Sequence, residues 1–439
     1  MFYINRDRAL DAALLHKMIN SFTCNIQPKL KKYKEYYDGK HEIMRKNYSD
    51  PSKPNSRVVT NYCMNIVNNY CGYIATPGYI SYQSDNDIEP ILDVLRYNDY
   101  QTEDSDFLHT ALTYGVATEL MYLDNNGKIR FGLINPENCF GIYEDSLSAD
   151  LLYFVRFYKA SEWDDSDLYY VDVYSDYDIK HYAMRGVNGG LEFLGEEPHY
   201  FSQCPANIFY LQDEKSIFDC IMCIQDAINE VLSSEIDDFS AFCDAYLLLT
   251  NSDADDEELA AMKASRVIIL PEGASAEWLT KNASDTQVEN ILKRLHDSAY
   301  RIAQCPDFSS ESFVGGVSSG IAIQYRLTGC ENRAGMIEGR MQKALQRRIE
   351  ILAGVISMTV GEEIWRDINI DFKRNIPEDM SNTIALVNAL KGTISDETLL
   401  TQIPFVDDVN AEMEKLKKQK EEAMALYSFD YDDTEDEAV

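Results

Sequence analysis

The sequence predicts an α+β fold, in which a region of short strands is followed by long helices. Three observations lead to this prediction. Apolar residues alternate with a period of two between about 116 and 210, which is typical of antiparallel strands. They then recur every three to four residues over 215–246, 284–304 and 321–360, which is typical of amphipathic helices. The chain has 439 residues, enough for two or three domains with cores of their own.

The N-terminal part is predicted to be helical. Residues 8–38 form one helical pattern, which ends at Asp38-Gly39, and a polar loop with two prolines covers 47–57. Further helices are expected over 60–75, which stops before Thr76-Pro77-Gly78, and over 102–114.

Short strands follow in the part of the chain with period two. Residues 117–124 and 128–134 flank Asn125-Asn126-Gly127, and a turn of this kind between alternating segments predicts a hairpin. The remaining strands are expected over 151–158, 169–175, 179–184 and 191–194. Together they predict an antiparallel sheet region that reaches about residue 210.

The clearest element is a long helix over 215–246. Projected at about 100° per residue, its apolar side chains gather on one side and a narrow stripe of acids lies opposite, within roughly 40°. The stripe consists of Asp219, Asp226, Glu230, Asp237 and Asp244. Such a stripe is either a solvated helix face or a surface that repels polyanions.

A small mixed unit over 247–283 separates this helix from a second one. Ser284 and Gln287 form a capping box, so the second helix is expected to begin there and to stop at Cys305-Pro306. Its apolar positions are Val288, Ile291, Leu295, Ala299 and Ile302, a spacing suited to packing against another helix.

A loop rich in glycine and serine (307–320) leads into a third long helix, in which four glycines predict a kink. A basic stripe repeats at every seventh residue of this helix: Arg326, Arg333, Arg340 and Arg347. A strand is expected over 368–375 and helices over 380–401 and 407–427. The last twelve residues contain six acids and no base, so they are predicted to be disordered.

The charge and the cysteines exclude several classes of protein. With 74 acidic and 40 basic residues the chain carries a net charge of −34, which opposes tight non-specific binding to nucleic acid. Ten scattered cysteines do not form a disulfide framework, so reduced thiols in a cytoplasm are expected. No signal peptide is expected, because charges lie within the first apolar stretch of the chain. No membrane span is expected either, because no run reaches about 18 apolar residues.

The order of these elements and the wording of several segments resemble the phage portal family typified by Bacillus-infecting siphophages. The segments are EIDDFSAFCDAYLLLT, RVIILPEG, AEWLTKN and GGVSSGIAIQYRLTGCENRA, with YYDGKHEI and INPENCFGIYED in the N-terminal half. The resemblance covers about residues 35–400. It is carried by the ordered set rather than by any single motif.

The resemblance implies a ring-forming subunit with a wing, a stem, a clip and a crown. In this chain they would be the wing (1–210), a stem helix (211–246), the clip (247–283), a second stem helix (284–306), the tunnel loop (307–320), a long kinked helix with a returning wing strand (321–376), the crown helices (377–427) and an acidic disordered tail (428–439). The tunnel loop would comprise Asp307, Phe308, Ser309, Ser310, Glu311, Ser312, Phe313, Val314, Gly315, Gly316, Val317, Ser318 and Ser319.

The implied function is mechanical and needs no cofactor, metal or catalytic residue. Partners would be further copies of the chain in a ring, expected to be a dodecamer, the terminase large subunit, the head-completion adaptor, and the major capsid and scaffolding proteins. Double-stranded DNA would pass through the channel without tight binding. The location would be a capsid vertex of the virion, and the host cytoplasm during assembly, with no membrane partner.

Within that picture both charged stripes have two interpretations. The acids would face the channel, so that DNA slides past a repulsive wall, or they would be an exposed helix face. The arginines would pair with acidic faces of a neighbouring subunit, which is favoured, or would contact phosphates of DNA.

Other functions are weighed against the portal. Gly316-Val317-Ser318-Ser319-Gly320 matches the nucleophile elbow of serine hydrolases, but a polar loop precedes it where that motif needs a strand. Cys220 and Cys223 lie inside a predicted helix with no second pair at zinc spacing, so buried apolar cysteines are favoured. A virion or prophage assembly protein without a DNA channel is the main alternative.

Overall fold

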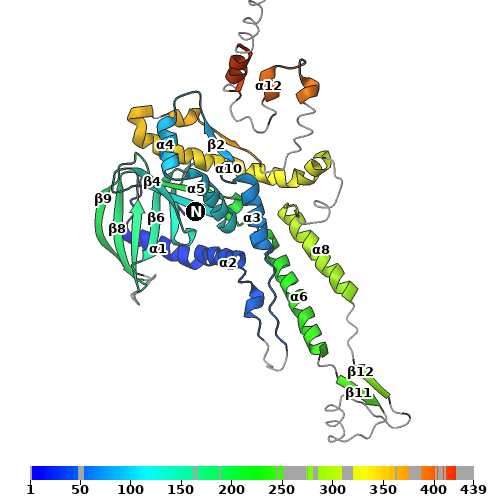
Figure 1. Cartoon of the computed structure of the whole chain (residues 1–439). Coiled ribbons are helices and arrows are strands. Elements are labelled where there is room, and N and C mark those ends of the chain that lie inside the picture. Colours follow the sequence, from blue (N-terminus) through cyan, green and yellow to red (C-terminus); the bar gives the residue numbers. More distant parts are fainter. Residues whose placement is uncertain are drawn as a thin grey trace, which may run out of the picture. The chain divides into compact units, whose positions relative to one another are not determined.

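The structure is a computed structural model, and it divides into two compact units, Met1–Asn375 and Ile376–Val439. It describes residues 2–47, 54–161, 163, 167–186, 189–243, 246–250, 273, 275–279, 285–308, 320–360, 363–374, 387–400, 403, 409 and 412–421. The fold is a mixture of helices and sheets, as predicted (Figure 1).

The N-terminal helices lie where the sequence predicts them. They are α1 (Ala12–Ser21), a π-helical turn η1 (Phe22–Ile26), α2 (Gln27–Tyr37), a 3₁₀ turn η2 (Glu42–Arg45), α3 (Tyr62–Ile74) and α5 (Tyr100–Tyr114). Asp11 caps α1 by accepting a hydrogen bond from the N–H of Leu14 at 2.7 Å. The helix α4 (Glu89–Tyr97) is not identified from the sequence.

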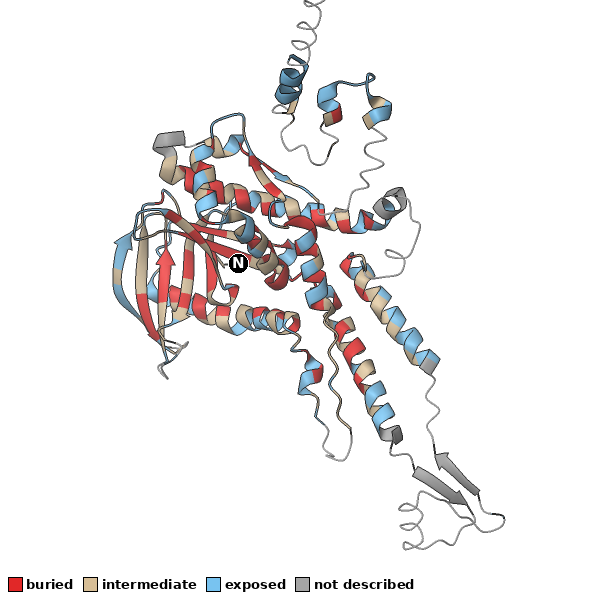
Figure 2. Ribbon diagram, in the orientation of Figure 1, coloured by how far each residue is buried: buried red, intermediate tan, exposed pale blue. Residues whose placement is uncertain are grey.

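A six-stranded sheet forms the largest layer of the first unit. Its strands are β1 (Phe2–Ile4), β5 (Cys139–Glu144), β6 (Leu151–Lys159), β7 (Leu168–Tyr174), β8 (Asp178–Arg185) and β9 (Leu191–Pro198), hydrogen-bonded in that order. β1 pairs with β5 in parallel, and the other neighbours are antiparallel. Leu15, Ile19 and Phe22 pack on this sheet against Phe157 and Val171, so the core lies between the sheet and the α1–η1 helices (Figure 2).

A second sheet joins the predicted hairpin to a later strand. The hairpin consists of β3 (Val116–Leu123) and β4 (Ile129–Ile134), with Thr118 opposite Ile134, and β10 (Ala206–Tyr210) pairs with the other edge of β3. The 3₁₀ turns η3 (Pro136–Asn138) and η4 (Gln212–Glu214) flank these strands.

The long helix predicted over 215–246 is shorter in the structure. A 3₁₀ turn, η5 (Asp219–Ile221), precedes α6 (Met222–Cys243), and β11 (Tyr246–Thr250) begins immediately beyond it. Tyr246, the last residue of the predicted helix, therefore belongs to a strand. β11 pairs antiparallel with β12 (Ser275–Leu279), and α8 (Asp285–Ala303) returns alongside α6.

The helix predicted over 321–360 is α10 (Gly320–Val360), 41 residues long, and its glycines do not interrupt it. A 3₁₀ turn, η6 (Ile364–Asp367), follows it. The predicted strand after it is β13 (Asn369–Phe372), which pairs antiparallel with β2 (Ile80–Gln83) and so returns the chain to its N-terminal half.

In the second unit the helix predicted over 380–401 is not continuous. Helical residues 387–390 and α12 (Asp396–Leu400) are separated by a turn at which Gly392 has a φ of +85°. A further helical stretch covers 412–421, within the helix predicted over 407–427.

Candidate functional site: the paired helices and the long helix α10

Two acids of the predicted stripe, Asp219 of η5 and Asp226 of α6, have partners on α2. Tyr33 donates a hydrogen bond to Asp219 and Tyr36 donates one to Asp226, both at 2.6 Å. Burial, reinforced by these carboxylates, raises the pKa of both tyrosines, so both hydroxyls remain donors at any ordinary pH. Two of the stripe's acids therefore hold α2 against the η5–α6 helix.

The next two acids of the stripe contact the chain that follows α2. Glu230 pairs with Lys46 at 3.0 Å, and Asp237 accepts a hydrogen bond from the N–H of Ser56 at 2.7 Å. The Glu230 side chain remains 57% exposed. Asp244, the fifth acid of the stripe, lies outside the described residues.

The contact at Asp237 is the end of a regular series, which we call the ladder. Four α6 side chains spaced four residues apart accept hydrogen bonds from alternate main-chain N–H groups of an extended segment. The pairs are Gln225 with Tyr62 (2.8 Å), Asn229 with Thr60 (3.0 Å), Ser233 with Val58 (3.0 Å) and Asp237 with Ser56 (2.7 Å).

The ladder has a simple geometric basis. Four residues of α-helix rise by about 6.0 Å, and two residues of extended chain advance by about 6.6 Å, so the two series of groups stay in register over a few steps. The helix thus supplies side-chain acceptors in the way that a neighbouring strand would supply carbonyls. The segment from Ser56 to Tyr62, which we call the strap, is fixed along α6 without being a strand.

His41 ties the ladder to α2. Its ring is fully buried, and Asn229 lies 2.8 Å from Nδ1 while the carbonyl of Tyr36 lies 2.8 Å from Nε2. Burial lowers the pKa of His41, so the ring is neutral, with Nε2–H donating to the carbonyl and Nδ1 accepting from the amide.

One prediction separates the two kinds of stripe acid. Asp226→Asn is expected to weaken the Tyr36 contact, because a neutral acceptor replaces a charged one, and to lower the free energy of unfolding by about 1–2 kcal/mol. Glu230→Gln alters an exposed pair and is expected to leave the thermal midpoint unchanged. Thermal unfolding of both variants is the measurement, and equal midpoints would show that the Tyr36 contact contributes little.

The four arginines of the basic stripe do not share one role. Arg333 donates to the carbonyls of Ala303 (2.5 Å) and Ile217 (2.8 Å), which joins the end of α8 to the segment before α6. Arg347 donates to Gln203 (2.6 Å) and pairs with Glu350 at 2.7 Å. Arg326 is exposed.

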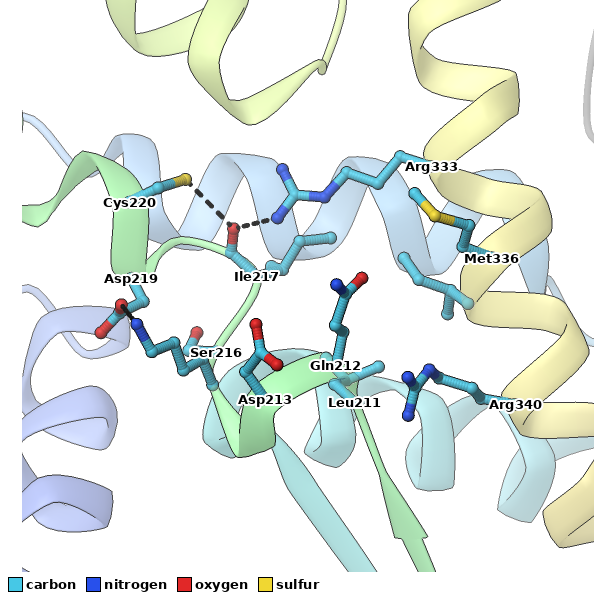
Figure 3. A pocket seen from close by; sticks show the side chains of 12 residues that line it. Leu211, Gln212, Asp213, Ser216, Ile217, Asp219, Cys220, Arg333, Met336 and Arg340 are labelled. Carbon is cyan, nitrogen blue, oxygen red and sulfur yellow. Dashed lines mark hydrogen bonds and ion pairs between the residues drawn. The ribbon is translucent and has the colours of Figure 1, made fainter.

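Arg340 differs from the other members of the stripe. It is exposed and, within the part of the chain that the structure describes, it makes no hydrogen bond or ion pair. It stands between two hollows beside α10 and lines both of them. The smaller, of about 240 Å³, is the elbow pocket, which Arg340 lines with Arg333, Met336 and Asp213 (Figure 3).

A buried arginine next to the stripe was missed in the sequence. Arg348 has no exposed surface and forms ion pairs with Asp104 of α5 and Glu119 of β3, which are buried as well. Its guanidinium carbon lies 4.6 Å from the centre of the Phe131 ring. One cation therefore meets two carboxylates where α5, β3 and α10 join.

Two further groups complete this cluster. Tyr82 donates to Asp104 at 2.8 Å, and Asn207 donates to Glu119 at 3.0 Å. Burial raises the pKa of Asp104, and the neighbouring Arg348 only partly offsets that effect. The signal that could have identified the cluster is a single arginine at a core position of an otherwise apolar helix face.

Several residues considered for chemistry lie apart or outside the described chain. Cys220 and Cys223 are free and exposed, so the prediction that they are buried is wrong. In the described ranges no group of three or more His, Cys, Asp and Glu residues could hold a metal ion. The hydrolase-like motif and the tunnel loop from Ser309 to Ser319 fall outside the described residues. None of the helices that the structure describes is long and apolar enough to cross a membrane.

Along the chain the six-stranded sheet is followed by the helix pair α6 and α8, with the β11–β12 hairpin between them, and then by the 41-residue helix α10. Comparison with known proteins shows the family of this chain. The chain belongs to the family described as "Phage portal protein, SPP1 Gp6-like", whose model matches residues 16–425. The resemblance found in the sequence is thereby confirmed, and this family is structural and not enzymatic.

Two curated relatives carry the name "Portal protein". The protein of Bacillus phage SPP1 is 22% identical over 440 residues, covering 93% of this chain and 86% of its own length. The protein of Clostridium phage phiCD119 is 21% identical over 428 residues, covering 89% of this chain and 92% of its own. The similarity is low in identity but extends over nearly the whole chain.

Proposed function

We propose that this chain is the subunit of a portal ring at one vertex of a phage capsid, through which double-stranded DNA is packaged and later ejected. The observation that supports the proposal is the family match over residues 16–425. A ring of twelve copies in the virion, assembled in the host cytoplasm, is part of the proposal.

The family architecture is proposed for this chain segment by segment. The sheets and N-terminal helices act as the wing, α6 and α8 as the stem, and the β11–β12 hairpin as part of the clip. The clip binds the terminase large subunit during packaging and the head-completion adaptor afterwards. The wing contacts the major capsid and scaffolding proteins, and the crown consists of the helices after residue 377.

We propose that fewer acids face the channel than the five of the predicted stripe. Asp219, Asp226 and Asp237 have partners within the subunit, and one carboxylate oxygen each of Asp226 and Asp237 is buried without a hydrogen-bond partner among the described residues. Glu230 is the described stripe acid with most of its side chain exposed. We propose Glu230 as the member of the stripe that faces DNA, together with the tunnel loop.

The proposal predicts that the purified full-length chain assembles into rings with a central hole. Negative-stain imaging and native mass spectrometry are the measurements, and the mass should be an integral multiple of 50.2 kDa close to twelve copies. Compact particles without a hole at every protein concentration would contradict the portal proposal and favour an assembly protein without a channel.

A further inference from the structure

The larger of the two hollows that Arg340 lines has a volume of about 730 Å³, and we call it the α10 groove. It lies between α10, the strand β10 and the turn from Ser148 to Leu152, and Arg340 and Lys343 line its α10 side. Both side chains are exposed, and neither makes a hydrogen bond or ion pair within the described part of the chain.

These two cations lie one turn apart on the same helix face. Like charges three residues apart are neighbours and destabilise a helix by a few tenths of a kcal/mol. The chain has 74 acidic residues that could offset this repulsion, yet none of those described pairs with Arg340 or Lys343. An external anion would relieve the repulsion.

The other charges of the groove already have partners. Arg347 pairs with Glu350 at 2.7 Å, and Arg6 pairs with Glu144 at 3.7 Å. The carboxylate of Asp176 accepts the N–H of Cys204 at 3.2 Å. Arg340 and Lys343 are thus the cations of the groove that remain available.

The lining of the groove favours a protein segment over DNA. Asp150, Asp176 and Glu350 share the hollow with the cations, and a phosphate backbone would be repelled by these carboxylates. Leu152, Ile208 and other apolar residues line it too. A protein segment offers carboxylates, donors and apolar side chains together, as this lining requires.

The occupant that fits is a second copy of this chain. Each copy has 74 acidic against 40 basic residues, so a neighbouring copy can supply the carboxylates that Arg340 and Lys343 lack in their own described chain. In a closed ring every subunit presents one face to the next subunit, so one groove is filled per contact.

We propose that the α10 groove receives a carboxylate-bearing segment of the neighbouring subunit, anchored by Arg340 and Lys343. This inference rests on the proposed function, because it requires a ring. It makes these two residues, rather than the whole arginine stripe, the basic anchors between subunits.

The test is the charge reversal Arg340→Glu with Lys343→Glu in the full-length chain. The double variant is expected to fold normally, since neither side chain has a partner in its own described chain. It should require at least about tenfold more protein to assemble half of the chain into rings, because two interfacial ion pairs become repulsive. Mass photometry across a concentration series measures this midpoint.

The matched control is Lys17→Glu with Lys31→Glu, which changes the net charge equally at exposed positions of α1 and α2. Wild type and control should form rings at the same concentration. An equal loss in both variants would reduce the effect to net charge and overturn the inference. Rings formed normally by the groove variant would also overturn the inference. If those rings failed only in packaging DNA, Arg340 and Lys343 would be contacts to DNA phosphates instead.

A direct measurement complements the charge reversal. A photoreactive p-benzoylphenylalanine at position 343 is expected to yield a covalent dimer on irradiation of wild-type-like rings, with the crosslink in an acidic segment of the second copy. Crosslinks confined to the same chain would contradict the inference. If the wild-type chain forms no ring, the portal proposal and this inference both fail. The outcomes above assume a wild-type chain that does form rings, so they test this inference alone.

Discussion

Arg348→Met is expected to lower the free energy of unfolding by about 3–5 kcal/mol, a large share of the stability of a typical domain. Arg348 has no exposed surface, and its guanidinium is the cation that faces Asp104 and Glu119. Methionine preserves much of the volume but leaves two buried carboxylates without a counter-charge. Urea unfolding below the ring-forming concentration measures the loss.

The neighbouring residue provides the control. Arg347 is 30% exposed, and Arg347→Met is expected to cost less than about 1 kcal/mol, since it removes a partly exposed pair with Glu350 and one hydrogen bond to Gln203. A triple variant that combines Arg348→Met with Asp104→Asn and Glu119→Gln should recover part of the lost stability, because no buried charge remains. A single variant as stable as wild type would show that the cluster contributes little.

Asp104 gives the cluster a pH dependence of defined sign. Because burial raises its pKa in the folded state, the folded chain binds a proton more readily than the unfolded chain. The resulting stabilisation is complete below the unfolded pKa of about 3.9 and is lost as the pH rises through the higher folded pKa. Asp104→Asn should remove this component, so the stability of the variant should change less between acid and neutral pH than that of wild type, which urea unfolding at both pH values measures.

The strands and the N-terminal helices could be predicted because their sequence period reports directly on burial. The hairpin of β3 and β4 is an example, since a turn ending in Gly127 lies between two alternating segments and Gly127 has a φ of +72°. The end of α6 could not be predicted in the same way. Phe242 and Tyr246 continue the apolar spacing of the helix, but the chain leaves the helix after Cys243 and pairs Tyr246 with Leu279.

The partners of the charged stripes within the chain could not be predicted from the sequence, for a physical reason. A helix with a polar residue at every fourth position is interpreted as having a solvated face, because the sequence does not reveal which segment packs against that face. Opposite α6 lies the main chain of the strap, whose N–H groups are the same for almost any residue type. Arg348 is the opposite case, a charged residue that is buried. It lies between Leu345 and Leu352 on a buried helix face, and its acidic partners come from elements distant in the sequence.

The strap allows a further strong prediction. Asn229→Leu is expected to lower the free energy of unfolding by about 2–4 kcal/mol, because leucine of similar size leaves the N–H of Thr60 and Nδ1 of His41 without partners in a buried site. Asp237→Asn is the comparison and is expected to cost no more than about 1–2 kcal/mol, the loss expected of Asp226→Asn, because its amide oxygen still accepts from the N–H of Ser56. Urea unfolding of both variants distinguishes the ladder from a general loss of polarity in α6.

Hydrogen exchange resolves the same ladder residue by residue. The amides of Ser56, Val58, Thr60 and Tyr62 have α6 acceptors, whereas those of Arg57, Val59 and Asn61 have none among the described residues. Alternate protection is therefore expected along a segment that lies outside helices and strands up to Asn61 and ends at the first residue of α3, and Asn229→Leu should abolish it first at Thr60. Uniform exchange along the wild-type strap would contradict the ladder. Alternate protection would show that one face of the stem helix acts as a sheet edge, which ties the predicted wing to the predicted stem.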